Sequence, residues 1–373
     1  MKGNSRGVRR KAGSATIAGM VAALVLNVTP VAAPAVSAPP PSPPLVGFSF
    51  SPWSVPRLLN ETPAAALRTL LNTLHPDLIR LPIYWSQVQP WPDAFDFSAP
   101  DGLIEIIRQY NRHHRRATRV VFVVGVRNLV YPEVYVPGWL PPSQGADLRQ
   151  ITAGPAYRTY LTTAVTRYAA LPELFAWQVE NEPLDSVTTN TGHSPALTTT
   201  LVDNEIDVLR AADRSHPVVV TTFNSSHISL DKKGRSPLAW LYRLLPGPKA
   251  SGHPGDTLQM GDVLGLDVYV VTPTTPLSED AAEERIAWKS DIITYWSAQA
   301  RAAGKQLWIT EMQGVPWEDA PGFTPQDLVD SATAYHDRGA SVVLLWGVES
   351  WIFSREWMKA GVEAMDRLRS PTP

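Results

Sequence analysis

Two glutamates stand where apolar segments give way to polar ones. Glu182 lies in Asn181-Glu182-Pro183 directly after the run LFAWQVE, and Glu311 ends the run QLWITE. A carboxylate at such a border is costly to bury unless it is paired or used. Two carboxylates that face one cavity can cleave a glycosidic bond, because one supplies a proton to the leaving oxygen while the other, ionised, attacks or stabilises the anomeric carbon.

Eight short apolar runs, each followed by a longer amphipathic stretch, recur from Leu45 onward. Most are nearly continuous in hydrophobicity and rich in Val and Ile, as parallel strands covered on both faces should be. The expected strands are 45–50, 78–83, 119–126, 174–180, 217–223, 263–270, 306–311 and 341–347. Eight β/α units predict an α/β fold, a single (β/α)₈ TIM barrel over residues 45–370. A doubly wound open sheet is the alternative, but the first strand is not followed by a Gly-rich turn.

Helix signals fall between these strands. Thr62-Pro63, Ser194-Pro195 and Thr324-Pro325 each join an N-cap residue to a proline at the first helical position. In the stretch 101–116, apolar residues recur at i, i+3, i+4 and i+7, which places them on one helical face. We therefore expect helices to begin at these three pairs and to cover 63–75 and 101–116.

In a TIM barrel the chemistry lies at the carboxyl ends of the strands. That edge would carry Arg80 from the second strand, Tyr269 from the sixth and Trp346 from the eighth. Seven of the 13 tryptophans also fall at or just after expected strand ends, namely Trp53, Trp85, Trp91, Trp139, Trp317, Trp346 and Trp351. Flat rings with a polar edge suit the C–H faces of sugars, so this grouping favours a carbohydrate groove, although a single tryptophan can equally well pack a loop.

An ordered set of motifs resembles the clan A glycoside hydrolases, the retaining (β/α)₈ enzymes that include the cellulase-like family 5 and the family 42 β-galactosidases. The motifs are I-R-x-P-x-x-W at 79–85, W-x-x-x-N-E-P at 177–183, G-L-D-V-Y at 265–269, W-I-T-E at 308–311 and the eighth-strand Trp346. They occur in the family's order and on the expected strands, and the resemblance covers residues 45–370. The chain departs from family 5 in having no His near Arg127 and in reading Asp267-Val268-Tyr269 where that family reads H-x-Y.

The resemblance implies a role for each matched residue. Glu182 would be the general acid/base and Glu311 the nucleophile of a double displacement that retains the anomeric configuration. The implied substrate-binding residues are Asn181 at the sugar 2-hydroxyl, Tyr269 and Arg80 at the nucleophile, Trp346 as the floor of the cleaved sugar's subsite, and Trp85. The implied partner is an oligo- or polysaccharide, and no cofactor is implied.

The composition excludes several other kinds of chemistry. The chain has no cysteine, which removes disulfides, thiolate metal sites and cysteine nucleophiles. Its formal charge of −2 lacks the basic excess that nucleic acid binding needs. The eight histidines show no metal-ligand spacing, and no G-x-S-x-G is present, so we expect neither a metal site nor a serine esterase.

Two alternatives remain, one for the role of Glu180 and one for the function of the chain. Glu180 has the same strand parity as Glu182, so we expect it to point into the barrel and pair with an arginine. A carbohydrate-binding barrel without hydrolytic activity is the competing function. The presence of both Glu182 and Glu311 disfavours it, because a degenerate enzyme usually loses one of the two.

The N-terminal residues read as an export signal. Positive charges at positions 2–11 precede an apolar run at 17–28 that is too short to span a membrane, and a small-residue cleavage site places the new N-terminus at Val36. Residues 1–35 are thus the expected signal peptide, and 36–44 form a Pro-rich spacer. We expect secretion to the extracellular space or cell envelope without stable membrane insertion. The sequence leaves the export route, the sugar, the endo or exo mode of cleavage and the oligomeric state open.

Overall fold

The structure is a computed structural model. It describes residues 43–130, 133–140, 148–185, 187–189, 192–194, 196–223, 254–272, 282–317 and 322–370. The expected signal peptide and most of the Pro-rich spacer lie outside the described residues. Within the described part of the chain, no helix combines the length and the apolar character needed to cross a membrane.

Eight parallel strands close into a barrel. The order around it is β1, β10, β9, β8, β7, β4, β3 and β2. The bounds are β1 (Leu45–Ser49), β2 (Leu78–Pro82), β3 (Arg119–Val124), β4 (Leu174–Val179), β7 (Val218–Phe223), β8 (Val263–Val268), β9 (Gln306–Gln313) and β10 (Val342–Trp346). Each lies within one of the eight expected segments or extends it by two residues. The predicted TIM barrel is confirmed, and the open sheet is excluded.

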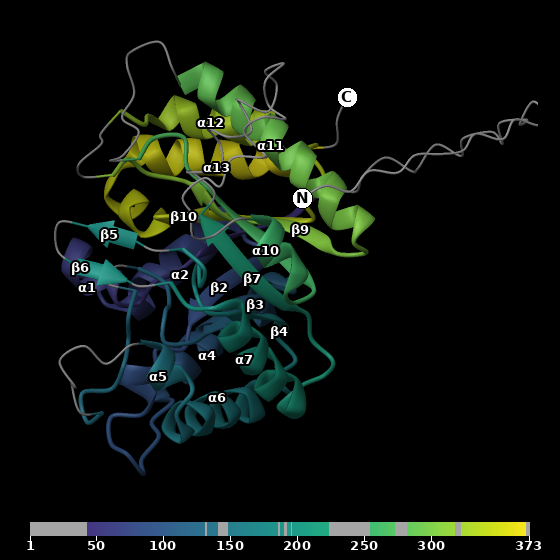
Figure 1. Ribbon diagram of the computed structural model, residues 1–373. Coiled ribbons are helices and arrows are strands. Elements are labelled where there is room, and N and C mark those ends of the chain that lie inside the picture. The colour runs from purple at the N-terminus through teal and green to yellow at the C-terminus, as the bar shows by residue number, and fades with distance from the viewer. Residues whose placement is uncertain are drawn as a thin grey trace, which may run out of the picture. The chain divides into compact units, whose positions relative to one another are not determined.

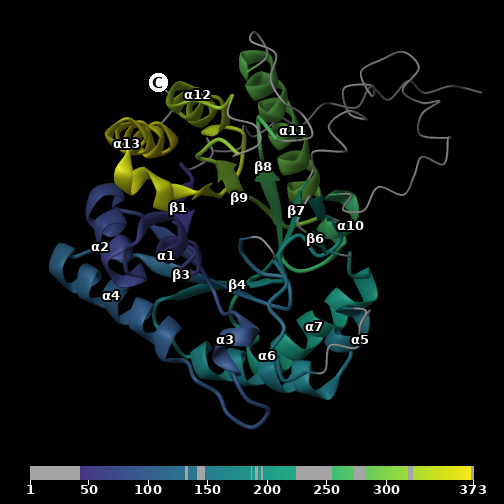
Figure 2. The same ribbon diagram turned by 90° about the vertical axis from the view of Figure 1, so that its left-hand side faces the viewer.

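Helices surround the strands, as both views show (Figure 1, Figure 2). Between the strands lie α1 (Ser54–Leu59), α2 (Pro63–Leu74), α3 (Trp85–Val88), α4 (Ser98–His114), α5 (Leu148–Thr152), α6 (Pro155–Tyr168), α7 (Thr199–Ala212), α10 (Pro254–Gln259), α11 (Ala282–Ala302) and α12 (Pro325–Tyr335). The 3₁₀-helix η1 (Val348–Phe353) and α13 (Arg355–Arg369) follow β10, and a short hairpin of β5 (Val187–Thr189) and β6 (Gly192–Ser194) follows β4.

Two of the three expected helix starts are confirmed. The Thr62 side chain accepts from the Ala65 N–H, and Thr324 forms a capping box with Asp327. The third is wrong, because Ser194 belongs to β6 and α7 begins only at Thr199, with Thr198 as its N-cap. A second Ser/Thr further along the chain made the better cap.

The barrel interior changes from apolar to polar along the strands. One cluster of buried side chains takes members from seven strands: Leu78, Val121, Ala176, Val219, Val263, Trp308, Val342 and Leu344. Two residues further along, on the same faces, come polar side chains that include Arg80, Gln178, Thr221 and Thr310, each of them fully buried. The apolar layer therefore closes one end of the barrel and supports a polar layer toward the carboxyl ends of the strands.

A β-bulge in β9 interrupts this regular alternation. Against β8, the register passes from Leu266 opposite Ile309 to Asp267 opposite Glu311, so β9 has one extra residue. Against β10, β9 advances three residues from Ile309 to Met312 while β10 advances two. An extra residue re-aims the side chains that follow it. The bulge explains how Thr310 and Glu311, although adjacent, both make contacts inside the barrel.

Glycine at position 47 is required by the approach of β1 to β2. A Cβ atom built there would lie 1.9 Å from the Leu78 carbonyl oxygen, a backbone atom that cannot move aside. We expect Gly47→Ala to lower the free energy of unfolding by about 1–3 kcal/mol, the usual cost of overpacking. Urea denaturation followed by tryptophan fluorescence measures this.

Gly102, inside α4, provides the matched control. A Cβ atom there would meet no atom within 4 Å. Gly102→Ala should therefore raise stability by about 0.5–1 kcal/mol, because alanine is the better helix former. Equal effects of the two substitutions would contradict the packing described for β1 and β2.

Candidate active site

Arg80 of β2 is the centre of the polar layer. Its Nε donates to Gln178 Oε1 at 2.7 Å, and its Nη2 donates to Asn181 Oδ1 at 2.7 Å. Its Nη1 donates to Ser49 Oγ at 3.1 Å and to Glu311 Oε1 at 2.6 Å. The guanidinium is fully buried. It thus ties β1, β2, β4 and β9 together and pairs with one of the two glutamates that the sequence singled out.

Glu311 is held on both oxygens. Arg80 binds Oε1, and the Tyr269 hydroxyl donates to Oε2. Burial, and then the negative charge of Glu311, raise the pKa of Tyr269 well above its ordinary value, so its hydroxyl keeps its proton and remains a donor. Glu311 thus accepts from one cation and from one neutral donor.

Glu182 has a different environment. It follows β4 with a left-handed backbone (φ 45°), and its backbone N–H donates to Thr221 Oγ1 at 2.9 Å. Burial, and then the charge of Asp267, raise the pKa of Glu182 well above its ordinary value. One carboxylate oxygen each of Glu182, Asp267 and Glu311 lie within 4.8 Å of one another. The two glutamates thus lie close together in different surroundings, and those of Glu182 favour its protonated form.

Glu180 corrects an expectation from the sequence. It does not pair with an arginine side chain; its carboxylate accepts from the backbone N–H groups of Val126 and Arg127 at 2.9 and 2.5 Å and from the Tyr157 hydroxyl at 2.9 Å. The expectation assumed that Glu180 and Glu182 lie on one strand and share a face. However, β4 ends at Val179, and the backbone at Glu180 is left-handed (φ 58°). Glu180 therefore fixes the turn that presents Asn181 and Glu182.

Asp267 is a third carboxylate that sequence reasoning did not place in the site. It lies on β8, is fully buried, and its Oδ1 accepts from Thr310 Oγ1 at 2.6 Å. Burial, and then the charge of Glu311, raise the pKa of Asp267 well above its ordinary value. The available signal was an acidic residue inside an apolar strand, two positions before Tyr269 and therefore on the same face.

The predicted tryptophans divide into two groups. Trp346 is partly exposed and stacks on Trp317 with ring centres 5.0 Å apart, and Tyr269 lies against both at 5.6 and 5.3 Å. These three rings form an aromatic wall beside Glu311. Trp351, by contrast, is fully buried, and its Nε1 donates to the Gly314 carbonyl.

The structure places Trp85 in the core beside α6. Its side chain is fully buried, its Nε1 donates to Gln89 Oε1 at 2.7 Å, and its ring stacks on Tyr160 at 5.4 Å. Position 85 begins the short helix α3, which turns the ring toward α6 and the outer core. A place just after a strand end does not fix the direction of a side chain.

A second layer of charges surrounds Glu182. Arg127, fully buried, donates to Glu133 Oε2 at 2.8 Å and to the Asp185 carbonyl at 2.5 Å. Burial raises the pKa of Asp185 to about 8. Further round the barrel, Glu349 accepts from the Ser51 N–H at 2.5 Å, and burial raises its pKa to about 7. The site as a whole is rich in carboxyl groups, and burial raises the pKa of several of them.

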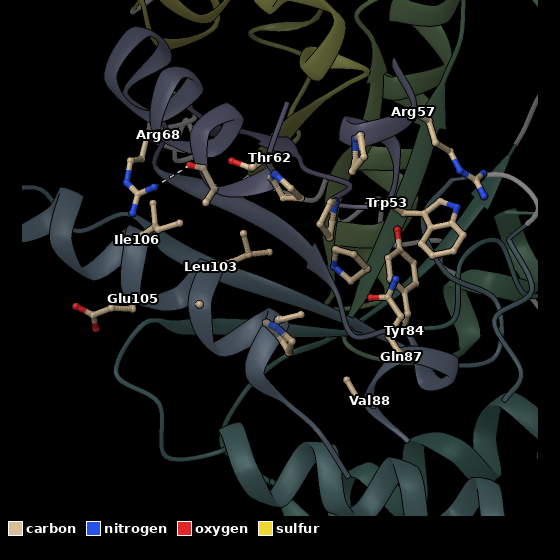
Figure 3. Close-up of a pocket in the computed structure, with 18 of the residues that line it drawn as sticks. Trp53, Arg57, Thr62, Arg68, Tyr84, Gln87, Val88, Leu103, Glu105 and Ile106 are labelled. Carbon is tan, nitrogen blue, oxygen red and sulfur yellow. Dashed lines mark hydrogen bonds between the residues drawn. The ribbon is translucent and has the colours of Figure 1, made fainter. Parts of the chain in front are cut away.

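A separate groove lies outside the barrel. It encloses about 760 Å³ and is lined mainly by apolar atoms from α2, α4 and the segments after β1 and β2. Figure 3 shows Leu103 and Ile106 on one side and Trp53 and Tyr84 at the other end. None of Arg80, Glu182, Asp267 and Glu311 lines it.

Comparison with known proteins gives a match in structure only. No protein family model matches the chain, and no characterised protein is significantly similar in sequence. A GH5_18 protein from Streptomyces cattleya, crystallised as a variant in complex with Manb1-4GlcNAc, is similar with a TM-score of 0.61 and 16% identity over 88% of this chain and 82% of that one.

Two further structures share the barrel. An exo-beta-1,4-mannosidase from Opitutaceae bacterium strain TAV5 has a TM-score of 0.54 and 16% identity, over 88% of this chain and 60% of that one. A beta-galactosidase from the haloarchaeon Halorubrum lacusprofundi has a TM-score of 0.53 and 12% identity, over 88% and 58%. The resemblance read from the motifs is thereby confirmed at the level of the fold.

The network around Arg80 predicts an unequal cost of removing two arginines. Arg80→Met would leave the buried Glu311 carboxylate without its cation, and we expect it to lower the free energy of unfolding by about 3–5 kcal/mol. Arg108 forms a similar pair with Glu173 at 3.0 Å, but its side chain is 36% exposed. Arg108→Met should cost less than about 1 kcal/mol. Urea denaturation compares the two, and equal losses would contradict the structural role given to Arg80.

Proposed function

We propose that the chain is a retaining glycoside hydrolase that cleaves a β-linked glycan or glycoside by double displacement. The observation that carries the proposal is the pair of Glu182 and Glu311, which lie close together in different surroundings. One carboxylate oxygen of Glu182 and one of Glu311 lie within 4.8 Å of each other. Retaining enzymes place their carboxyl groups roughly 5–5.5 Å apart, whereas inverting enzymes need roughly 6.5–9.5 Å to admit a water. The spacing supports retention.

In the first step, Glu311 is the nucleophile. One of its oxygens forms a bond to the anomeric carbon while the bond from that carbon to the leaving oxygen breaks. Arg80 and Tyr269 hold the carboxylate in place for this attack. Glu182 gives its proton to the leaving oxygen, which departs as a hydroxyl group.

In the second step, Glu182 is the base. A water oxygen attacks the anomeric carbon, the ester bond to Glu311 breaks, and a water proton passes to Glu182. The enzyme returns to its starting protonation, and the sugar leaves with its original anomeric configuration after two inversions.

Two features favour a sugar as the group bound. The partly exposed Trp346, stacked on Trp317, offers a flat apolar surface beside the nucleophile. The Asn181 Oδ1 atom is taken by Arg80, which leaves the amide N–H group as a donor for a sugar hydroxyl. Because structural neighbours carry the names of a mannosidase and a β-galactosidase, aryl β-mannosides and β-galactosides are the first substrates to test.

The chain is proposed to act outside the cell. The support is the charged and apolar pattern of residues 1–35, followed by the Pro-rich residues 36–44. An oligo- or polysaccharide in the surroundings would then be the substrate. Residues 36–44 would form a spacer between the barrel and the new N-terminus left by removal of the signal peptide.

Kinetics of two variants test the division of roles. Glu311→Gln should abolish turnover of every substrate, because no covalent intermediate can form. Glu182→Ala should slow substrates with poor leaving groups by roughly 10²–10⁴-fold, the usual worth of a positioned acid/base. Substrates with an activated phenol as leaving group need little protonation, so this variant should still form the covalent intermediate from them. Added azide should then attack the intermediate, restore turnover and give a β-glycosyl azide as product.

Glu173→Gln is the control, because Glu173 is a carboxylate on the outer surface that pairs with Arg108. It should leave kcat unchanged. Equal slowing of activated and unactivated substrates by Glu182→Ala, without azide rescue, would show that the roles are wrongly assigned. Binding of glycans with no release of sugar from any substrate would indicate a binding protein instead.

A further inference from the structure

Asp267 has one carboxylate oxygen that the structure leaves without a donor. Oδ1 accepts from Thr310, whereas Oδ2 is buried and has no hydrogen-bond partner in the described part of the chain. The carboxyl groups of Glu182 and Glu311 each place an oxygen within 4.8 Å of an Asp267 oxygen. An ionised oxygen buried without a donor is costly, but the hydroxyl of a protonated neighbouring carboxyl group can supply the missing donor.

The charges around Asp267 require a shared proton. Arg80 is the cation of the barrel interior, and its hydrogen bonds go to Gln178, Ser49, Thr310, Asn181 and Glu311, not to Asp267 or Glu182. Its charge lowers the pKa of Asp267, but burial and the charge of Glu311 outweigh this effect. Tyr269 is neutral. On the far side of Glu182, Glu133 and Asp185 face Arg127, and a negative charge on either carboxyl group raises the pKa of Glu182.

We propose that Asp267 is a positioning residue that shares one proton with Glu182, and so keeps the acid/base protonated until the leaving oxygen needs it. The role given to Glu182 rests on the proposed function. Two carboxyl groups at such a distance resist double ionisation, so the pair holds one proton over a wide pH range. Burial raises the pKa of both, which agrees with this geometry.

The pair also keeps the charge of the site constant. Before the first step, Asp267 and Glu311 are negative and Glu182 carries the proton. After it, Glu311 is a neutral ester and Glu182 is negative beside Asp267, so the negative charge has moved from Glu311 to Glu182. The charge of Asp267 then makes Glu182 a stronger base for the attacking water.

Asp267→Asn tests the proposal through the pH profile. The amide oxygen can still accept from Thr310, while the amide N–H group donates to Glu182 and the neighbouring charge is gone. The pKa of Glu182 should fall, and the alkaline limb of kcat/KM for an unactivated glycoside should move to lower pH by roughly 1–3 units. Activity on the acid side of the optimum should remain within about tenfold of wild type. A uniform loss with an unmoved limb would overturn the proposal.

Asp213→Asn is the matched control. Asp213 is also a buried carboxylate, and its Oδ2 accepts from Trp177 Nε1 at 2.8 Å, outside the site. This substitution should leave the alkaline limb where it is. All assays contain EDTA, because the oxygens of Glu182, Asp267 and Glu311 also lie close enough to bind one cation. If activity disappears with EDTA and returns with a divalent metal, a bound metal ion and not a shared proton links the three carboxyl groups, and the proposal is overturned.

Infrared difference spectra test the pair without any activity. Spectra recorded through a pH titration should show a protonated carboxyl band that disappears at high pH. Asp267→Asn and Glu182→Gln should each move the loss of this band to lower pH, because the carboxyl group that remains no longer has a charged neighbour. If each variant removes a separate band and leaves the midpoint of the other unchanged, the two groups do not share a proton. Because no substrate is involved, this result stands even if no glycoside is cleaved, so the two proposals can fail independently.

Discussion

The site depends on one buried cation. Arg80 enters the barrel interior from β2, above a layer of apolar side chains that closes the other end, and no water shell stabilises its charge there. Its hydrogen bonds instead reach Ser49, Gln178, Asn181 and Glu311, on three other strands or the loop after β4. A buried guanidinium is tolerated only when its donors are satisfied, so these four groups are fixed in place together. The arrangement that stabilises the cation also orients a carboxylate toward the cavity.

The asymmetry of Glu182 and Glu311 follows from which of them Arg80 reaches. Glu311 receives a cation and the Tyr269 hydroxyl, whereas Glu182, among the described residues, lies beside carboxyl groups whose charges raise its pKa. Two chemically identical side chains are thereby placed in different surroundings, and those of Glu182 favour its protonated form. Asp267 strengthens the difference, because its position beside Glu182 discourages loss of the proton. These contacts, and not the fold, support the proposed function, since a TIM barrel by itself supports many kinds of chemistry.

The fold was predictable because parallel strands covered on both faces are continuous apolar runs, and all eight were visible as such. The residues around Glu311 were harder. The bulge in β9 that lets Thr310 and Glu311 both face inward leaves no mark in the sequence, and neither does the left-handed backbone that redirected Glu180. Trp85 occupied a motif position at a strand end, yet α3 turns it into the core. Such local departures from regular alternation decide which side chains meet, and hydrophobic periodicity does not record them.

The proposed function depends on a covalent bond between the sugar and Glu311, which Arg80 and Tyr269 hold in place. Incubation of the wild-type protein with an activated 2-deoxy-2-fluoro β-glycoside, followed by proteolysis and mass spectrometry, tests it directly. The fluorine slows both steps, and the activated leaving group lets the first proceed, so the intermediate accumulates. The account predicts a protein heavier by one fluoroglycosyl group, with the label on the peptide that contains Glu311. Turnover of β-glycosides with no labelled protein, or a label on Glu182 or Asp267, would contradict it.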